Sequence, residues 1–236
     1  MKTSTDILRK RGFLTDTEAE PFFLSSKEEL LELLNDKQAV NRTAALNVLK
    51  TIVNINELDE ILLKMLVKEK ALYTKIKICD ILADGNELTI KRMIPYIGKI
   101  GANQHRTIPK RCSKKKSYPL PRDIIARTIA KMDSRYFDVI LENINNQNDF
   151  VVAEIIDVVG WQIFYHQELA IEKNYQVILD TIKRYQNNEF ILWKLIICLS
   201  AFNQAESLLK QWQSDNFVIK QEIERSIGLI NKRKGL

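Results

Sequence analysis

The chain of 236 residues contains few of the residues that interrupt helices, with 7 glycines and 5 prolines. An all-β protein needs such residues for its many turns, so their scarcity argues against that class. Hydrophobic residues make up 45% of the chain and charged residues 28%, which is typical of a folded domain rather than of a disordered segment. The composition therefore predicts an all-α fold with enough length for a continuous core.

Cysteine and histidine are also scarce. Cys79, Cys112 and Cys198 are far apart and odd in number, which predicts a reducing, intracellular setting rather than a disulfide framework. The only histidines are His105 and His166, and no Cys pair has zinc-ligand spacing, so we expect no metal and no cofactor. No apolar run approaches the roughly 18 residues that a membrane span needs, and the N-terminus lacks a secretory signal. We therefore expect a cytoplasmic protein without membrane contact.

Acidic residues are missing from one long stretch of the chain. From Leu88 to Arg122, thirty-five residues include no Asp or Glu and ten Lys or Arg. The formal net charge of the whole chain is +6, and without this stretch 26 basic and 30 acidic residues would give −4. The basicity is therefore local. A concentrated positive field on a slightly acidic body suggests an anionic partner.

The rest of the chain contains a recurring pattern, in which a polar turn and a hydrophobic entry residue precede an amphipathic helix. Successive segments begin 33, 48, 30, 40 and 27 residues apart. This spacing suits stacked antiparallel helix pairs, each of which needs a neighbour to bury its apolar face. The six predicted segments are Ala39–Ile52, Leu72–Ala83, Leu120–Met132, Phe150–Ile163, Phe190–Phe202 and Phe217–Ile230.

A second helix is expected to follow or precede each of these segments as its partner. Ser26 with Glu29 forms a capping box, Gly85 is a stop signal, and Pro121 suits a first helical position. The segments Phe150–Ile163 and Phe190–Phe202 are apolar on nearly every side, which places them in the middle of the stack. The predicted partner helices are Lys27–Asn35, Leu58–Val67, Leu88–Ile100, Tyr136–Ile144, Tyr175–Tyr185 and Ala205–Trp212.

One stretch resembles a known repeat. Asp36 in a turn, followed by Val40, Arg42, the small residue Ala45 and Leu49, is similar to the second helix of a HEAT repeat. The resemblance implies an all-α, right-handed α-solenoid of about six antiparallel helix pairs. It also implies an adaptor or scaffold that grips partners on a curved surface. We expect residues 1–26 to cap the stack, residues 27–232 to form the repeat domain with a basic insertion at 101–120, and residues 233–236 to form a tail.

The insertion is the candidate functional site. Its glycines and prolines predict a loop of roughly 18 residues, and loops of this length are usually either functional or disordered. One interpretation is an arm that grips a negatively charged protein or nucleic acid, with Tyr118 stacking on a base. The other is a solvated, mobile insertion whose lysines maintain solubility. The candidate anion-binding residues are Arg106, Lys110, Arg111, Lys114, Lys115, Lys116 and Arg122.

Evidence for catalysis is weak. The chain has no Gly-rich phosphate loop, no Gly-x-Ser-x-Gly motif and no His-Glu-x-x-His motif. Cys112 is either a plain exposed thiol or, beside Arg111, a thiol with a lowered pKa. Glu154 and Asp157 lie one turn apart and form either a solvated strip or partners for a nearby basic group. We therefore expect a non-catalytic binding protein.

Two alternatives remain open at this stage. The alkylpurine DNA glycosylases are built from HEAT-like repeats of about this length and place Trp and Asp on a basic concave surface. Their Trp-Trp-Asp run is absent, because Trp161, Trp193 and Trp212 stand singly in or beside apolar stripes. A nucleic-acid-binding relative of those DNA repair enzymes is one alternative. The other is a protein–protein adaptor in which the basic loop has no part.

Overall fold

The computed structural model describes residues 4–235, and every regular element in this range is a helix. The prediction of an all-α fold is therefore confirmed. The chain divides into two compact units, Met1–Ile100 and Gly101–Leu236. Within residues 4–235, no helix combines the length and the apolar character that crossing a bilayer requires.

Unit 1 contains seven α-helices among its described residues, of which α4 and α6 pack side by side. On one face of this pair, α3 packs on α4, α5 packs on α6, and α7 packs on α5. At the N-terminal end, α1, α2 and the 3-10 helix η1 pack on α4. The elements are α1 (Thr5–Lys10), α2 (Asp16–Ala19), η1 (Glu20–Leu24), α3 (Lys27–Leu33), α4 (Ala39–Ile52), α5 (Ile55–Lys68), α6 (Leu72–Ala83), α7 (Glu87–Met93) and η2 (Ile94–Tyr96).

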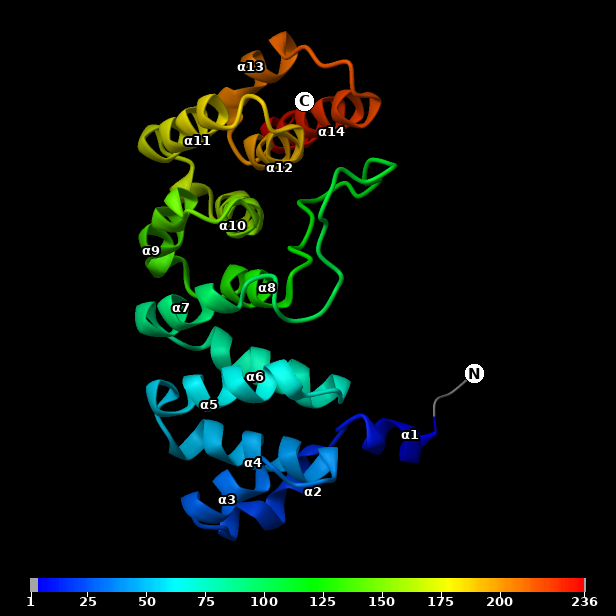
Figure 1. Ribbon diagram of the computed structural model, residues 1–236, viewed down its shortest axis with the longest axis vertical. Helices are drawn as coiled ribbons and strands as arrows, with labels where there is room; N and C mark the ends of the chain where they lie inside the picture. The colour runs from blue at the N-terminus through cyan, green and yellow to red at the C-terminus, as the bar shows by residue number, and fades with distance from the viewer. Residues whose placement is uncertain (1–3, 236) are drawn as a thin grey trace. The chain divides into compact units, whose positions relative to one another are not determined.

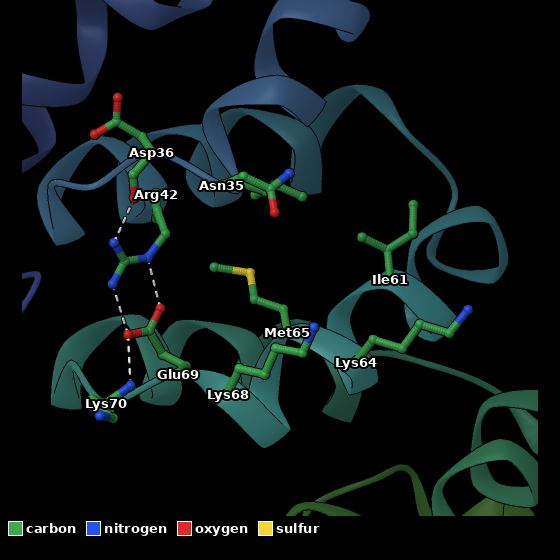
Figure 2. Close-up of a pocket in the computed structure, with 10 residues that line it drawn as sticks. Asn35, Asp36, Arg42, Ile61, Lys64, Met65, Lys68, Glu69 and Lys70 are labelled. Atoms are coloured by element: carbon green, nitrogen blue, oxygen red, sulfur yellow. Dashed lines mark hydrogen bonds and ion pairs between the residues drawn. The ribbon is translucent and has the colours of Figure 1, made fainter.

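Arg42 joins three segments of unit 1. Its Nε and Nη2 donate to the two carboxylate oxygens of Glu69 at 2.8 Å each, and its Nη1 donates to the carbonyl of Asp36 at 2.7 Å (Figure 2). Burial alone would raise the pKa of Glu69, but hydrogen bonds from Arg42 and from the Ala71 amide outweigh it and lower the pKa. These charges line a pocket of about 460 Å³ with Lys64, yet they satisfy each other. We interpret the pair as structural.

Unit 2 contains a row of helices in which α8, α10, α12 and α14 pack consecutively. The helices α9, α11 and α13 pack on one side of this row (Figure 1). The elements are α8 (Ile124–Ala130), η3 (Ser134–Tyr136), α9 (Phe137–Glu142), η4 (Asn143–Asn145), α10 (Asp149–Tyr165), η5 (Gln167–Leu169), α11 (Glu172–Arg184), α12 (Glu189–Leu199), η6 (Asn203–Ala205), α13 (Glu206–Gln211) and α14 (Phe217–Lys234).

The core of unit 2 lies around α10 and α12. All but a few side chains of these two helices are buried, because each has a neighbour in the row on both sides and α9 or α11 behind it. This burial explains why both segments are apolar around their whole circumference. The expectation that they occupy the middle of a helical stack is met within unit 2.

Several predicted boundaries agree with the structure and two are wrong. The bounds of α4 and α6 match the predicted segments, and the Ser26–Glu29 capping box is present. The predicted helix Leu88–Ile100 ends at Met93, because Pro95 follows within the 3-10 turn η2. The predicted helix Leu120–Met132 begins at Ile124, because the carboxylate of Asp123 caps it and Pro121 lies outside. At the C-terminus, α14 continues to Lys234, into the predicted tail.

Candidate anion-binding cleft

The predicted insertion is a long loop without helices or strands from residue 101 to residue 123. It crosses α10, α12 and α14 on the side of the row away from α9, α11 and α13 (Figure 1). Gly101, at its start, has φ of 76°, a left-handed conformation that glycine adopts without strain. The side chains that hold the loop in place come from all three of these helices.

Tyr118 anchors the loop to α10. Its side chain is 3% exposed, and its ring centroid lies 5.4 Å from that of Phe164. The ring fits over Gly160, where the helix has no Cβ, and near the backbone of Cys198 on α12. Burial raises the pKa of the Tyr118 hydroxyl well above its usual value. The residue therefore acts as a hydrophobic plug.

Two charged residues on α14 hold the loop tip. Arg225 donates from Nη2 to the carbonyl of Ser117 at 2.7 Å and from Nε to the carbonyl of Lys115 at 3.1 Å. Its Nη1 also pairs with Oε1 of Glu222 at 2.5 Å. The thiol of Cys112 donates to Oε2 of the same Glu222 at 3.1 Å. Buried Glu222 thus fastens both the loop and the arginine that grips it.

Aromatic contacts hold the first half of the loop. The guanidinium carbon of Arg106 lies 3.9 Å from the ring centroid of Phe150 on α10. The His105 ring meets Trp193 of α12 edge to face, with centroids 5.3 Å apart. Burial, followed by the positive charges of Arg122 and Lys194, lowers the pKa of His105. The imidazole is therefore neutral at pH 7.

All seven predicted anion-binding residues have exposed side chains on this loop. Within residues 4–235, Lys110, Arg111, Lys114, Lys115 and Lys116 take part in no ion pair. The loop backbone between them is fixed, whereas their charges are not neutralised by the protein. Such an arrangement favours an external anion, because little ordering of the backbone is needed on binding.

Between the loop and the row of helices lies a cavity of about 530 Å³, which we call the basic cleft. Five cationic side chains line it: Lys110, Arg111, Lys115 and Arg122 from the loop and Arg225 from α14. Asp157 and Glu222 are its only acidic lining residues among those that the structure describes. Its volume lies within the range of small-molecule sites, which is about 300–1,000 Å³.

A buried charge cluster lies beneath the basic cleft. Lys194 on α12 is 1% exposed, and its Nζ donates to Oε1 of Glu154 at 2.8 Å and to Oδ2 of Asp157 at 2.7 Å. Burial, together with the charge of Asp157, raises the pKa of Glu154 to about 7 despite the neighbouring ammonium. Asp157 is 15% exposed and lines the basic cleft, whereas Glu154 is fully buried.

These positions revise three interpretations of the sequence. Tyr118 is plugged into the core, so its ring is not exposed for stacking on a base. The pKa of Cys112 is not lowered, because burial and the bond to Glu222 raise it to about 12. Glu154 and Asp157 are not a solvated strip, since they pair with Lys194, which is the alternative that the sequence also suggested.

Sequence reasoning did not identify Arg225 or Glu222 as part of the site. Both lie about 110 residues beyond their loop partners, and no local pattern connects positions so far apart. It also treated the C-terminal lysines as incidental. A weak signal existed, because Arg225 and Lys232 are seven residues apart and therefore share one face of α14.

Among residues 4–235, no group of three or more His, Cys, Asp or Glu side chains is arranged to hold a metal ion. No known family model matches the chain. No curated protein matches it either. The assignment of a function therefore depends on the charges, burial and contacts of the basic cleft.

Proposed function

We propose that this protein is a non-catalytic binding scaffold of HEAT-like helix pairs arranged as a right-handed solenoid, whose basic loop engages a negatively charged partner. The alternation of two helical layers within each unit supports the repeat assignment. So does Arg42, the residue of the HEAT-like stretch, because it bonds back to the carbonyl of Asp36 in the preceding turn.

The observation that carries the binding proposal is the contrast between the backbone and the side chains of the loop. Tyr118, Cys112 and the carbonyls that Arg225 holds fix the backbone. The lysines of the tip, in contrast, project into solvent without acidic partners. A loop that served solubility alone would need neither the buried anchors nor a single sign of charge.

The test is a salt titration of binding to labelled polyanions, namely a single-stranded DNA oligonucleotide and polyglutamate. We expect at least one of them to bind with an affinity that falls steeply as salt rises, because bound cations release counterions. Replacing Lys114, Lys115 and Lys116 by Ala should reduce the slope of log K against log salt by up to about three.

A matched control is available in unit 1, where Lys64, Lys68 and Lys70 are also exposed. Their replacement by Ala removes the same charge and should leave the slope unchanged. Equal, weak binding by the parent protein and by both triple variants would refute the proposed function.

A second candidate is base excision from nucleic acid. The observation that favours it is that Asp157 and Trp193 both line the basic cleft. An acid and an aromatic residue in a cationic cleft are the groups that flipped-base chemistry uses. This candidate predicts release of alkylated bases from DNA, with the release lost in Asp157→Asn. Absence of release by the parent protein would eliminate it.

A further inference from the structure

A second cavity adjoins the basic cleft and differs from it in charge. This lysine pocket, of about 380 Å³, lies between the loop tip and α14. The lining residues that matter here are Lys114, Lys115, Lys116, Arg225, Gly228 and Lys232, and no acidic side chain lines the pocket among the residues that the structure describes. Lys115 and Arg225 belong to both cavities, so the lysine pocket and the basic cleft are neighbours along the loop.

Gly228 gives the lysine pocket an open floor. It lies inside α14, where glycine costs about 1 kcal/mol relative to alanine. No packing contact requires the glycine, because a Cβ at this position would meet no atom within 4 Å. A helix backbone exposed beneath a ring of cations allows close approach of a ligand. The pocket is thus open and wholly cationic, which suits a phosphate group.

The basic cleft has a different chemistry. It combines cations at its rim with the neutral His105 ring, Trp193 and the carboxylate of Asp157. A second phosphate or an acidic side chain would be repelled by Asp157. A nucleobase, in contrast, offers a planar face to the rings and amino groups that can donate to a carboxylate.

We propose that the anionic partner is a single-stranded nucleic acid, with a backbone phosphate in the lysine pocket and the adjacent base in the basic cleft. The proposal rests on the proposed function and specifies its partner. A single strand is required because a base can enter the cleft only when it is not paired or stacked. An acidic protein would use the lysine pocket but would gain nothing from the rings of the basic cleft.

The experiment compares three labelled probes: a mixed-sequence single-stranded DNA, an abasic deoxyribose-phosphate oligomer of equal length, and polyglutamate. The base-containing strand should bind at least about fivefold more tightly than the abasic one, because stacking on protein rings favours it. His105→Ala should remove most of this preference while leaving abasic binding unchanged. Unchanged abasic binding also shows that the loop is intact.

Gly228→Leu tests the lysine pocket. Leucine is a good helix former and would fill the floor, so binding of both oligomers should fall at least about fivefold while the melting temperature is unchanged or higher. Lys232→Ala should also weaken both. Lys220→Ala, which removes an exposed lysine of α14 outside both cavities, is the matched control and should have no effect.

Each result separates this inference from the proposed function. Polyglutamate bound as tightly as DNA would overturn the nucleic-acid assignment and leave anion binding in place. Equal affinity for the abasic and base-containing strands, or normal binding by Gly228→Leu, would overturn the assignment of the two cavities. Binding of none of the three probes would overturn both proposals.

Discussion

The hydroxyl of Tyr118 occupies the space that a Cβ on Gly160 would need, since the two atoms would lie 1.8 Å apart. The glycine of α10 is therefore a seat for the loop that carries the cationic residues. We predict that Gly160→Ala displaces Tyr118 and lowers the free energy of unfolding by about 1–3 kcal/mol, as overpacked cores do. Urea denaturation would measure the loss.

The same substitution at Gly228 is an internal control for this prediction. A methyl group there meets no neighbour, so Gly228→Ala should raise the free energy of unfolding by about 0.5–1 kcal/mol through helix propensity. Destabilisation of similar size in both variants would contradict the assignment of Gly160 as a seat.

Tyr118 provides a second prediction, because its buried hydroxyl has no hydrogen-bond partner among the described residues. Tyr118→Phe removes an unsatisfied polar group and should leave stability unchanged or raise it by up to about 1 kcal/mol. Tyr118→Ala removes the plug and should cost about 3–5 kcal/mol. A loss of several kcal/mol in the Phe variant, measured in the same urea titration, would indicate that the hydroxyl is bonded.

The charge cluster beneath the basic cleft predicts a dependence of stability on pH. Burial raises the pKa of Glu154 from 4.5 to about 7, with Asp157 opposing its ionisation and Lys194 favouring it. A raised carboxyl pKa means that the folded state holds the proton more tightly. The corresponding stabilisation is complete below about pH 4.5 and is lost as the pH rises through about 7.

We therefore expect the free energy of unfolding to fall by at most about 3 kcal/mol between pH 5 and pH 8 on account of Glu154. Glu154→Gln keeps an acceptor for Lys194 and does not titrate, so its stability should change less over the same interval. Urea unfolding of both proteins at the two pH values provides the measurement. Parallel pH profiles would show that Glu154 titrates normally.

The thiol of Cys112 should react slowly in the folded protein. Its pKa of about 12 leaves little thiolate at pH 8, and thiolate is the nucleophile. Alkylation followed by mass spectrometry should be at least about tenfold slower in buffer than in denaturant. Glu222→Gln removes the acceptor charge that raises the pKa and should accelerate labelling of Cys112. Fast labelling of the native protein would show that the contact with Glu222 is absent.

Local signals were sufficient to predict most of the fold. Apolar periodicity identified α4 and α6 to the residue, and the Ser26–Glu29 box marked the start of α3, because these features depend on neighbours within one or two turns. The errors lie at prolines. Pro95 ended α7 earlier than the hydrophobic pattern suggested, and Pro121 gave way to Asp123 as the start of α8.

The site could be predicted only in part. A missing sign of charge identified the loop and its seven exposed cations, because exposed cations need no partner to be recognised. What shapes the cavities comes from distant positions, such as Glu222 and Arg225 on the last helix and Lys194 between two acids of another. No spacing within a sequence encodes those encounters, which depend on how helices pack.

The attachment of the loop to α14 has a consequence for biosynthesis. A ribosome releases residues 101–123 well before it has made Glu222 and Arg225, so the nascent chain must carry the lysine-rich segment without its final clamp. The two cavities can form only when the last helix docks. Loss of that helix, by a premature stop or by proteolysis, would release the loop tip while every cationic residue of the loop itself remained in place.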